Sequence, residues 1–419
     1  MKHFLNSKIA ANLFSLTSAE IAKRLLGFFT LVYLGRTLNS TGFGIIGFAA
    51  AIISYFILIV NFGFNNYATV EIAKDTSKIQ TYVNNILSIR IFLSIILTAV
   101  LIVYLLYSEK TLETKYVILI TGITVYAHAI ALNWVFQAVE KMQIIAIRQV
   151  MGGLLSLIGV LLFVKTPNDV IVASIIISLS LLLGNTWFIP IYQKMYGKIK
   201  FEFDLRFWKE LIQKSFPLAY AAVMIGVYYN LDLVMLGYMQ SESDVGIFNA
   251  AFKVFLLGTL PFQLIFTSFF PSLSRVGLIN SREFRTLLTN FGKTVIGTGL
   301  LSGTIILLFS DRIIFIIFGE NYHNSVLPLS ILAVNIVVIG FNVFLGNPLI
   351  AWGKNKEYSI AITAGAVTNI VLNFILIPKY NYVGAALATL ASELAVFIGV
   401  FYLFKKFTLG LFSSKNNEV

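Results

Sequence analysis

The stretch ILSIRIFLSIILTAVLIVYLLY occupies residues 86–107, and Arg90 is its one charged residue. A run of about 20 apolar residues is long enough for a helix to cross the hydrocarbon core of a bilayer. The stretch therefore predicts a transmembrane helix, with Arg90 about one turn inside it.

Composition extends this prediction to the whole chain. Of the 419 residues, 58% are hydrophobic and 12% are charged, and 37 are Phe. Soluble domains carry roughly 25% charged residues, so this chain has too little polar surface to cover a water-soluble particle. We expect an all-α polytopic membrane protein of about twelve transmembrane helices. The predicted spans are residues 10–35, 43–65, 86–107, 116–139, 144–164, 169–192, 215–239, 245–272, 291–310, 325–350, 358–378 and 383–404.

Basic residues set the predicted orientation. The net charge is +12, which in a soluble protein would suggest nucleic acid. Here the Lys and Arg residues lie in short segments between apolar runs, and one side of the membrane receives about three times as many as the other. We therefore expect both termini in the cytoplasm, a retained first helix rather than a cleaved signal peptide, and no nucleic-acid partner.

A short internal repeat predicts two lobes. Val32-Tyr-Leu-Gly35, followed by Gly44-Ile45, matches Val234-Met-Leu-Gly237, followed by Gly246-Ile247. The offset near half the chain suggests pseudo-symmetric six-helix lobes around a central cavity, the geometry of alternating access. We expect an N-terminal lobe at 1–193, a basic cytoplasmic linker at 194–214, and a C-terminal lobe at 215–419 with a short cytoplasmic tail.

Charges inside the spans are candidate site residues. A charge deep in the hydrocarbon costs at least about 2.5–3.5 kcal/mol on insertion scales, so such charges are functional candidates. In the first span, Glu20, Lys23 and Arg24 share one helical face, and Glu20 neutralises only one of the two cations. A cationic cavity wall that holds an anionic headgroup is one interpretation, and a self-neutralised pair that eases insertion is the other.

The other embedded bases are Arg90, Arg148 and Lys253. Arg90 and Arg148 either line a cavity or extend to the cytoplasmic surface, whereas Lys253 lies about two turns inside its span, where reaching the surface is harder.

Two acids lie deep in the second half. Asp232 and Glu393 are each either a proton or cation coupling site or the partner of a buried base. Asn335 and Asn342, and Asn369 and Asn373, have helical spacing, which favours helix–helix hydrogen bonds over sugar contacts.

Enzyme chemistry has no support in the sequence. The chain has no cysteine, and His3, His128 and His323 are too scattered to predict a metal cluster. No phosphate-binding glycine loop, zinc-protease motif or nucleophile elbow occurs. We expect no cofactor and no metal centre.

Four segments resemble a known family. They are Leu34–Gly44, Asn230–Lys253 with Asp232 and Gly246, Ile317–Tyr322, and Pro378–Thr389 followed by Ser392-Glu393. In this order on about twelve predicted helices, they resemble the polysaccharide-transporter branch of the multidrug/oligosaccharidyl-lipid/polysaccharide exporter superfamily, the O-antigen flippases in particular.

The resemblance implies a function. Such proteins move an undecaprenyl-pyrophosphate-linked repeat unit from the cytoplasmic to the periplasmic leaflet of the bacterial inner membrane, and a polymerase and a ligase then build the O chain. It implies that Lys23, Arg24, Arg90, Arg148 and Lys253 bind pyrophosphate. Glu20, Asp232 and Glu393 are the candidates for coupling to a proton or sodium gradient, and a monomer is the simplest functional unit.

Two alternatives differ in their chemistry. A multidrug cation antiporter of the same superfamily would need a cavity dominated by acids and aromatics, whereas the embedded bases of this chain outnumber its embedded acids. A membrane glycan polymerase or ligase would need a long outer loop, which the predicted spans leave no room for.

Overall fold

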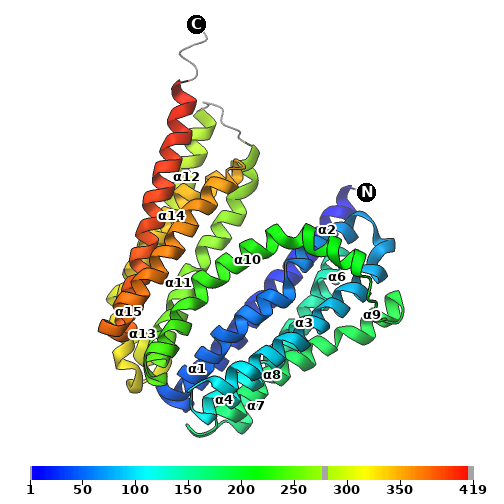
Figure 1. Cartoon of the computed structure of the whole chain (residues 1–419). Coiled ribbons are helices and arrows are strands. Elements are labelled where there is room, and N and C mark those ends of the chain that lie inside the picture. The colour runs from blue at the N-terminus through cyan, green and yellow to red at the C-terminus, as the bar shows by residue number, and fades with distance from the viewer. Residues whose placement is uncertain (1, 276–281, 414–419) are drawn as a thin grey trace. The chain divides into compact units, whose positions relative to one another are not determined.

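The computed structural model describes residues 2–275 and 282–413. Every regular element in these ranges is a helix, as predicted (Figure 1). The helices are α1 (Lys2–Asn61), α2 (Phe64–Lys74), η1 (Thr76–Lys78), α3 (Ile79–Tyr107), α4 (Leu112–Thr121), α5 (Ile123–Ala129), α6 (Asn133–Ala138), α7 (Met142–Phe163), α8 (Val170–Thr186), α9 (Phe188–Tyr196), α10 (Leu205–Met239), α11 (Glu242–Arg275), α12 (Arg282–Leu308), α13 (Ser310–Phe318), η2 (Glu320–Ser325), α14 (Val326–Ala351) and α15 (Asn355–Ser413).

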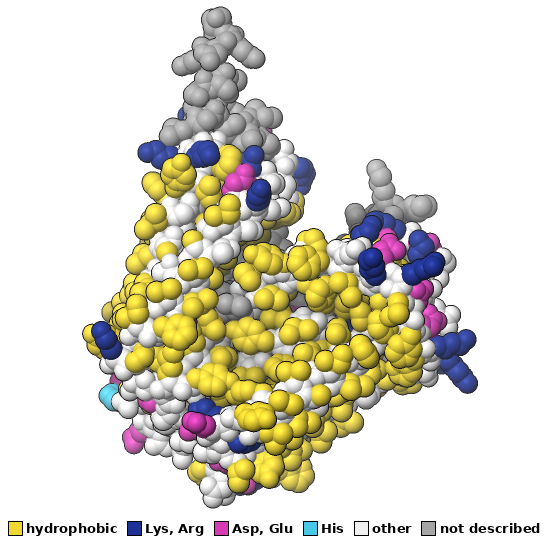
Figure 2. Space-filling model, viewed as in Figure 1, with side chains coloured by type: hydrophobic (Ala, Val, Ile, Leu, Met, Phe, Trp, Pro, Cys, Tyr) yellow, Lys and Arg dark blue, Asp and Glu magenta, His cyan; other side chains and the backbone are white. Residues whose placement is uncertain are grey.

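Nine stretches in the described ranges are long and apolar enough to cross a membrane. Hydrophobic side chains cover the flanks of the helices, and many of the charged side chains in this view lie near helix ends (Figure 2). This distribution suits helices whose flanks face lipid and whose ends face water. The chain is a multi-pass membrane protein.

The longest helices contain breaks. α1 has 60 residues, about three times the length that crosses a bilayer core, and Asn39 interrupts it with φ 56° and ψ −178°. Asn381 interrupts the 59-residue α15 in the same manner, with φ 51°. Asn tolerates positive φ better than most residues, which suits it to a turn between two spans. Both breaks lie between pairs of predicted spans.

The fourth predicted span, 116–139, is not one continuous helix. It is divided into α4, α5 and α6, with Ile130–Leu132 outside regular structure between the last two. Trp134 closes this irregular segment by donating from Nε1 to the Ala131 carbonyl over 3.1 Å. Irregular backbone at membrane depth is tolerated where the protein itself buries it, and the side chains of Leu132, Trp134 and Val135 are at most 2% exposed.

The chain divides into two compact units, Met1–Asn230 and Leu231–Val419, so the boundary falls inside α10. In the first unit α1 packs against α7, α4 and α5, and α7 also packs against α8. In the second unit α14 is the central helix and contacts α11, α12 and α15. The predicted linker 194–214 contains the end of α9 and the start of α10. The last residues of the predicted cytoplasmic tail, 414–419, lie outside the described residues.

Gly63 lies in the turn between α1 and α2 and packs closely against α10. Gly63 has φ +73°, and a Cβ placed on it would lie 2.8 Å from the Leu218 Cβ and 3.0 Å from the Ser215 carbonyl oxygen. Any larger residue would therefore have a strained backbone and would also push α10 away.

We predict that Gly63→Ala lowers the melting temperature of the purified protein in detergent more than Gly353→Ala does. Gly353 has the same φ, +73°, but a Cβ on it would meet no atom within 4 Å, so it is a matched control for backbone strain alone. The steric overlap at Gly63 should add about 1–3 kcal/mol of destabilisation. Equal melting temperatures for the two variants would show that the contact with α10 carries no stability.

Candidate functional site

The first-span triad occupies the surface of α1. Arg24 Nε lies 2.9 Å from Glu20 Oε1, and Lys23 Nζ lies 3.5 Å from Glu20 Oε2. All three side chains are roughly 40–50% exposed. One carboxylate therefore serves two cations, as the sequence predicted, and the group keeps one net positive charge.

Arg90 is buried completely inside the first unit, with 0% of its surface exposed. Its Nη2 donates to Asn65 Oδ1 over 2.7 Å, and its Cζ lies 6.0 Å from the centroid of the Phe64 ring. Among the described residues, Nε and Nη1 have no hydrogen-bond partner. Arg90 therefore does not extend to the membrane surface, and its charge is held by one neutral amide and an aromatic face.

Arg148 repeats this arrangement on α7. It is 9% exposed, its Nη1 donates to Asn185 Oδ1 over 3.3 Å, and its Cζ lies 5.7 Å from the centroid of the Phe188 ring. Asn185 in turn donates to the Ala127 carbonyl over 2.8 Å, which fixes the orientation of its amide. Arg148 does not reach the surface either.

The first unit therefore contains an uncompensated positive interior. Within the described side chains, no carboxylate forms an ion pair with Arg90 or Arg148. An interior of this kind attracts anions.

Sequence reasoning missed Asn65 and Asn185, the acceptors that hold the two guanidinium groups. The first lies 25 residues from Arg90 and the second 37 residues from Arg148. No periodic pattern in the sequence predicts either pair.

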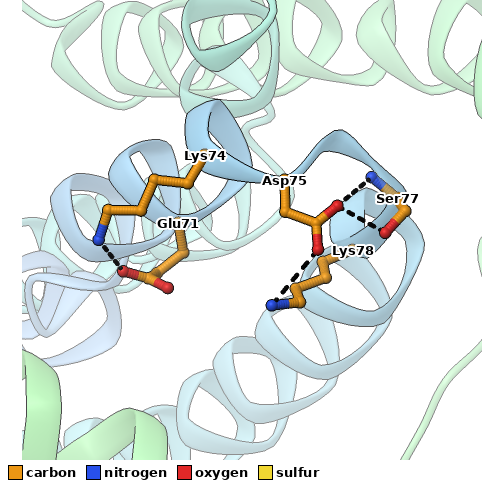
Figure 3. Close-up of polar contacts among 5 residues, drawn as sticks. All are labelled: Glu71, Lys74, Asp75, Ser77 and Lys78. Carbon is orange, nitrogen blue, oxygen red and sulfur yellow. Dashed lines mark hydrogen bonds and ion pairs between the residues drawn. The ribbon is translucent and has the colours of Figure 1, made fainter.

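Other basic residues in the first unit are neutralised locally. At the corner between α2 and α3, Lys74 Nζ lies 2.8 Å from Glu71 Oε1, and Lys78 Nζ lies 3.4 Å from Asp75 Oδ2 (Figure 3). The Ser77 hydroxyl and N–H donate to Asp75 and hold the pKa of its carboxyl below the ordinary value. Lys74 and Lys78 are therefore each paired with a local acid, unlike the two buried arginines.

Asp232 is the centre of a polar cluster in the second unit. The residue is 3% exposed. Its Oδ1 accepts from Asn373 Nδ2 at 2.6 Å and from Asn369 Nδ2 at 3.1 Å, and its Oδ2 accepts from Thr389 Oγ1 at 2.7 Å. Three donors thus stabilise one carboxylate where no water is available. Asn369 and Asn373, which were predicted to share a helical face, make a helix–helix contact. Thr389 is a third donor to Asp232 that the sequence did not predict.

Glu393 lies one turn beyond Thr389 on α15 and is 6% exposed. Asn342 Nδ2 donates to its Oε2 over 2.5 Å and to its backbone carbonyl over 3.0 Å. Asn335, seven residues before Asn342, is fully buried, and neither of its side-chain polar atoms has a partner among the described residues.

Lys253 is half-buried on α11. No described carboxylate lies within ion-pair distance of it. It is the one predicted substrate-binding base in the second unit, whereas Lys23, Arg24, Arg90 and Arg148 all belong to the first.

Solved structures share this fold. The structure aligns with the lipid II flippase MurJ in an inward closed conformation at a TM-score of 0.75 and 18% identity, covering 96% of this chain and 93% of that one. It aligns with an inward-facing multidrug resistance MATE family transporter of the MOP superfamily at a TM-score of 0.71 and 13% identity, covering 92% and 95%. The fold is that of the MOP superfamily transporters.

The family follows from the sequence match. The model of the family described as "Polysaccharide biosynthesis protein" matches residues 9–276, more than half of the chain, and the chain belongs to this family. A protein of Escherichia coli (strain K12) named as an O-antigen transporter is 27% identical over 92% of this chain and 94% of its own length. The capsular polysaccharide biosynthesis protein CapF of Staphylococcus aureus is 22% identical over 93% and 97%. The predictions of this family, and of a transporter rather than an enzyme, are confirmed.

We predict that Asn65→Ala lowers the stability of the purified protein and that Asn65→Asp raises it. The first variant removes a hydrogen bond to a buried charge, which is worth about 1.5–3 kcal/mol, and the second neutralises Arg90. Thermal unfolding in detergent measures both. If Asn65→Asp is no more stable than the parent, another group already compensates the charge of Arg90.

Proposed function

We propose that this chain is a flippase that moves an undecaprenyl-pyrophosphate-linked oligosaccharide, an O-antigen-type repeat unit, from the cytoplasmic to the periplasmic leaflet. The observation that carries the proposal is the pair of buried arginines, Arg90 and Arg148, each held by a neutral Asn and a Phe ring with no described acid beside it. A pyrophosphate is the anion that such a unit would attract. The family and the named O-antigen transporter among its relatives support the same substrate class.

Arg90 cannot touch a substrate in the described conformation, because it has no exposed surface, and Arg148 is only 9% exposed. We propose that the half-exposed Lys23 and Arg24 make the first contact with the headgroup. The two arginines then supply the positive potential behind it, and they become contacts when the first unit rearranges during alternating access. Lys253 is the proposed base from the second unit.

Twelve crossings remain the proposed topology. Two of the nine apolar stretches, Glu20–Lys74 and Asn355–Thr408, contain 55 and 54 residues. Each is long enough for two crossings, since about 20 residues suffice for one. α10 supplies one more, which supports six helices in each of two lobes. We keep 1–193 and 215–419 as these lobes, with both termini in the cytoplasm.

The charge distribution separates this function from a multidrug cation antiporter, whose fold is shared. A cation site needs acids at the substrate, whereas here the buried bases Arg90 and Arg148 have no described acid to pair with. The embedded acids of the second unit are Asp232 and Glu393, and both are more than 90% buried. Amide groups donate to both carboxylates, and a hydroxyl also donates to Asp232.

We propose that Asp232 is the coupling site for a proton or a sodium ion, with Glu393, one turn beyond Thr389 on α15, as a second titratable group. A carboxylate, two amides and a hydroxyl are hard oxygen donors of the kind that alkali and alkaline-earth cations prefer. Rotation of the Asn369 and Asn373 amides would present their oxygens in place of their NH₂ groups. Glu20, half-exposed and paired with Arg24, is the weaker candidate.

The expected partners follow from the substrate. A polysaccharide polymerase and a ligase would use the translocated unit in the periplasm, and a bacterial inner membrane is the expected location. A monomer contains both lobes and is the simplest functional unit.

We predict that Arg24→Gln and Lys253→Gln each abolish function without loss of protein from the membrane. In a strain that lacks the gene, surface polysaccharide should disappear and undecaprenyl-pyrophosphate repeat units should accumulate inside. The parent gene should clear them, and neither variant should. Lys74→Gln is the matched control, because Lys74 is a base already paired with Glu71, and it should complement fully. Full complementation by both test variants would refute the assigned bases.

We predict that sodium or protons stabilise the parent protein through Asp232. The melting temperature should rise with sodium at constant ionic strength, or shift with pH, and Asp232→Asn should remove that response. Asp75→Asn, which changes an exposed acid outside the apolar stretches, should keep it. An identical ion response in the parent and in Asp232→Asn would place the coupling site elsewhere.

A further inference from the structure

The segment of residues 197–204, between α9 and α10, is bound along one face of α3. Gln80 Nε2 donates to the Lys198 carbonyl at 3.3 Å, the Lys200 N–H donates to Asn84 Oδ1 at 3.0 Å, and the Glu202 N–H donates to Ser88 Oγ at 2.9 Å. The three α3 residues are four apart and share a face. The segment therefore follows α3 for two turns, roughly 12 Å, from its cytoplasmic end toward the membrane.

A carboxylate secures the deep end of this segment. Glu202 Oε1 accepts from Asn84 Nδ2 at 2.8 Å, and Oε2 accepts from Asn85 Nδ2 at 3.0 Å. Both amides are 1% exposed. A carboxylate needs such donors where it cannot rely on water. The polar atoms of the segment are thus turned toward α3.

Three large apolar side chains at the deep end of the segment point the other way, whereas Ile199 packs against the core. Phe201, Phe203 and the first residue of α10, Leu205, are 62%, 66% and 73% exposed. They alternate with Glu202 and Asp204, the period expected of an extended chain with two unlike faces. In water the apolar face would be turned inward, so an outward face of three large apolar residues indicates a non-aqueous environment.

This apolar face is continuous with the outer face of α3. The Trp208 ring lies 5.5 Å from the Phe203 ring and 6.0 Å from the Phe92 ring. Phe92 is 47% exposed and begins a helically spaced run of exposed apolar residues on α3, namely Ile95, Ile96, Val100 and Val103. That run belongs to an apolar stretch long enough to cross the membrane. We therefore expect the same medium, the lipid bilayer, to cover the outer face of α3 and the apolar face of the segment.

Basic residues flank the apolar face. Lys198, Lys200, Arg206 and Lys209 are all exposed. Apolar and aromatic residues beside Lys and Arg are typical of segments that lie in the interface of a membrane with anionic lipids.

We propose that residues 197–205 form a lipid-embedded strap. It lies at the boundary between headgroups and acyl chains in the leaflet that the basic loops assign to the cytoplasm. Its Lys198 and Lys200, with the neighbouring Arg206 and Lys209 of α10, bind anionic lipid phosphates. Glu202 and the α3 amides keep its polar side against the protein. The strap requires only that the chain lies in a bilayer, and it does not depend on which substrate the protein moves.

The chain has no cysteine, so one introduced thiol carries a unique probe. Phe203→Cys would be labelled with an environment-sensitive fluorophore and reconstituted into phosphatidylglycerol vesicles that contain lipids with a nitroxide near the headgroup. We expect a blue-shifted emission and loss of most of the fluorescence to the nitroxide lipid, with little quenching by aqueous iodide. The control is Glu210→Cys, an exposed polar position on α10, which iodide should quench.

Two results would overturn the strap. Equal iodide quenching at both positions would place Phe203 in water, and protection from both quenchers would mean that protein covers it. In phosphatidylcholine vesicles the nitroxide quenching should be weaker, because the four basic residues lose their anionic partners. Identical quenching in the two lipids would refute the headgroup contacts.

Discussion

A bilayer core offers no hydrogen-bonding partner, and this constraint governs every polar group in the described helices. Asp232 obtains three donors from α15, and Arg90 obtains an amide and an aromatic face. The irregular segment before α6 is closed by the Trp134 indole. Even the strap follows this rule, since its polar atoms bond to α3 while its Phe side chains face outward. Arg90, Arg148 and Asp232 therefore each mark a specific contact between helices.

The two units satisfy this constraint with opposite charges. The first holds guanidinium groups with neutral acceptors, and the second holds carboxylates with neutral donors. Among the described residues, Arg90, Arg148 and Asp232 form no ion pair with a neighbour of opposite sign. Such an arrangement costs folding free energy, because a buried charge is most cheaply held by a counter-ion or replaced by an apolar residue. Retaining it is consistent with one unit that attracts an anion and another that responds to a cation or proton.

Much of the fold was predictable, because hydropathy is a local property. The breaks at Asn39 and Asn381 fall between predicted spans, and Arg90, Arg148 and Asp232, singled out from the sequence, are buried in the structure. The division of span 116–139 was not predictable, because its apolar composition suits both a continuous helix and a protein-buried irregular segment. Asn65, Asn185 and Thr389 were missed for another reason. A single neutral polar residue in an apolar helix does not reveal its partner. It looks the same in the sequence whether it bonds to backbone or to a buried charge.

The sequence by itself determined where the helices cross, which charges they carry into the membrane, and the transporter family. These properties depend on runs of about 20 neighbouring residues and on short motifs. Only the tertiary structure decided which polar groups meet. Asp232 and Thr389 are 157 residues apart, and Asn84 and Glu202 are 118 apart. Their contacts depend on how whole helices pack, because in a medium without water each group must find its partner on another helix.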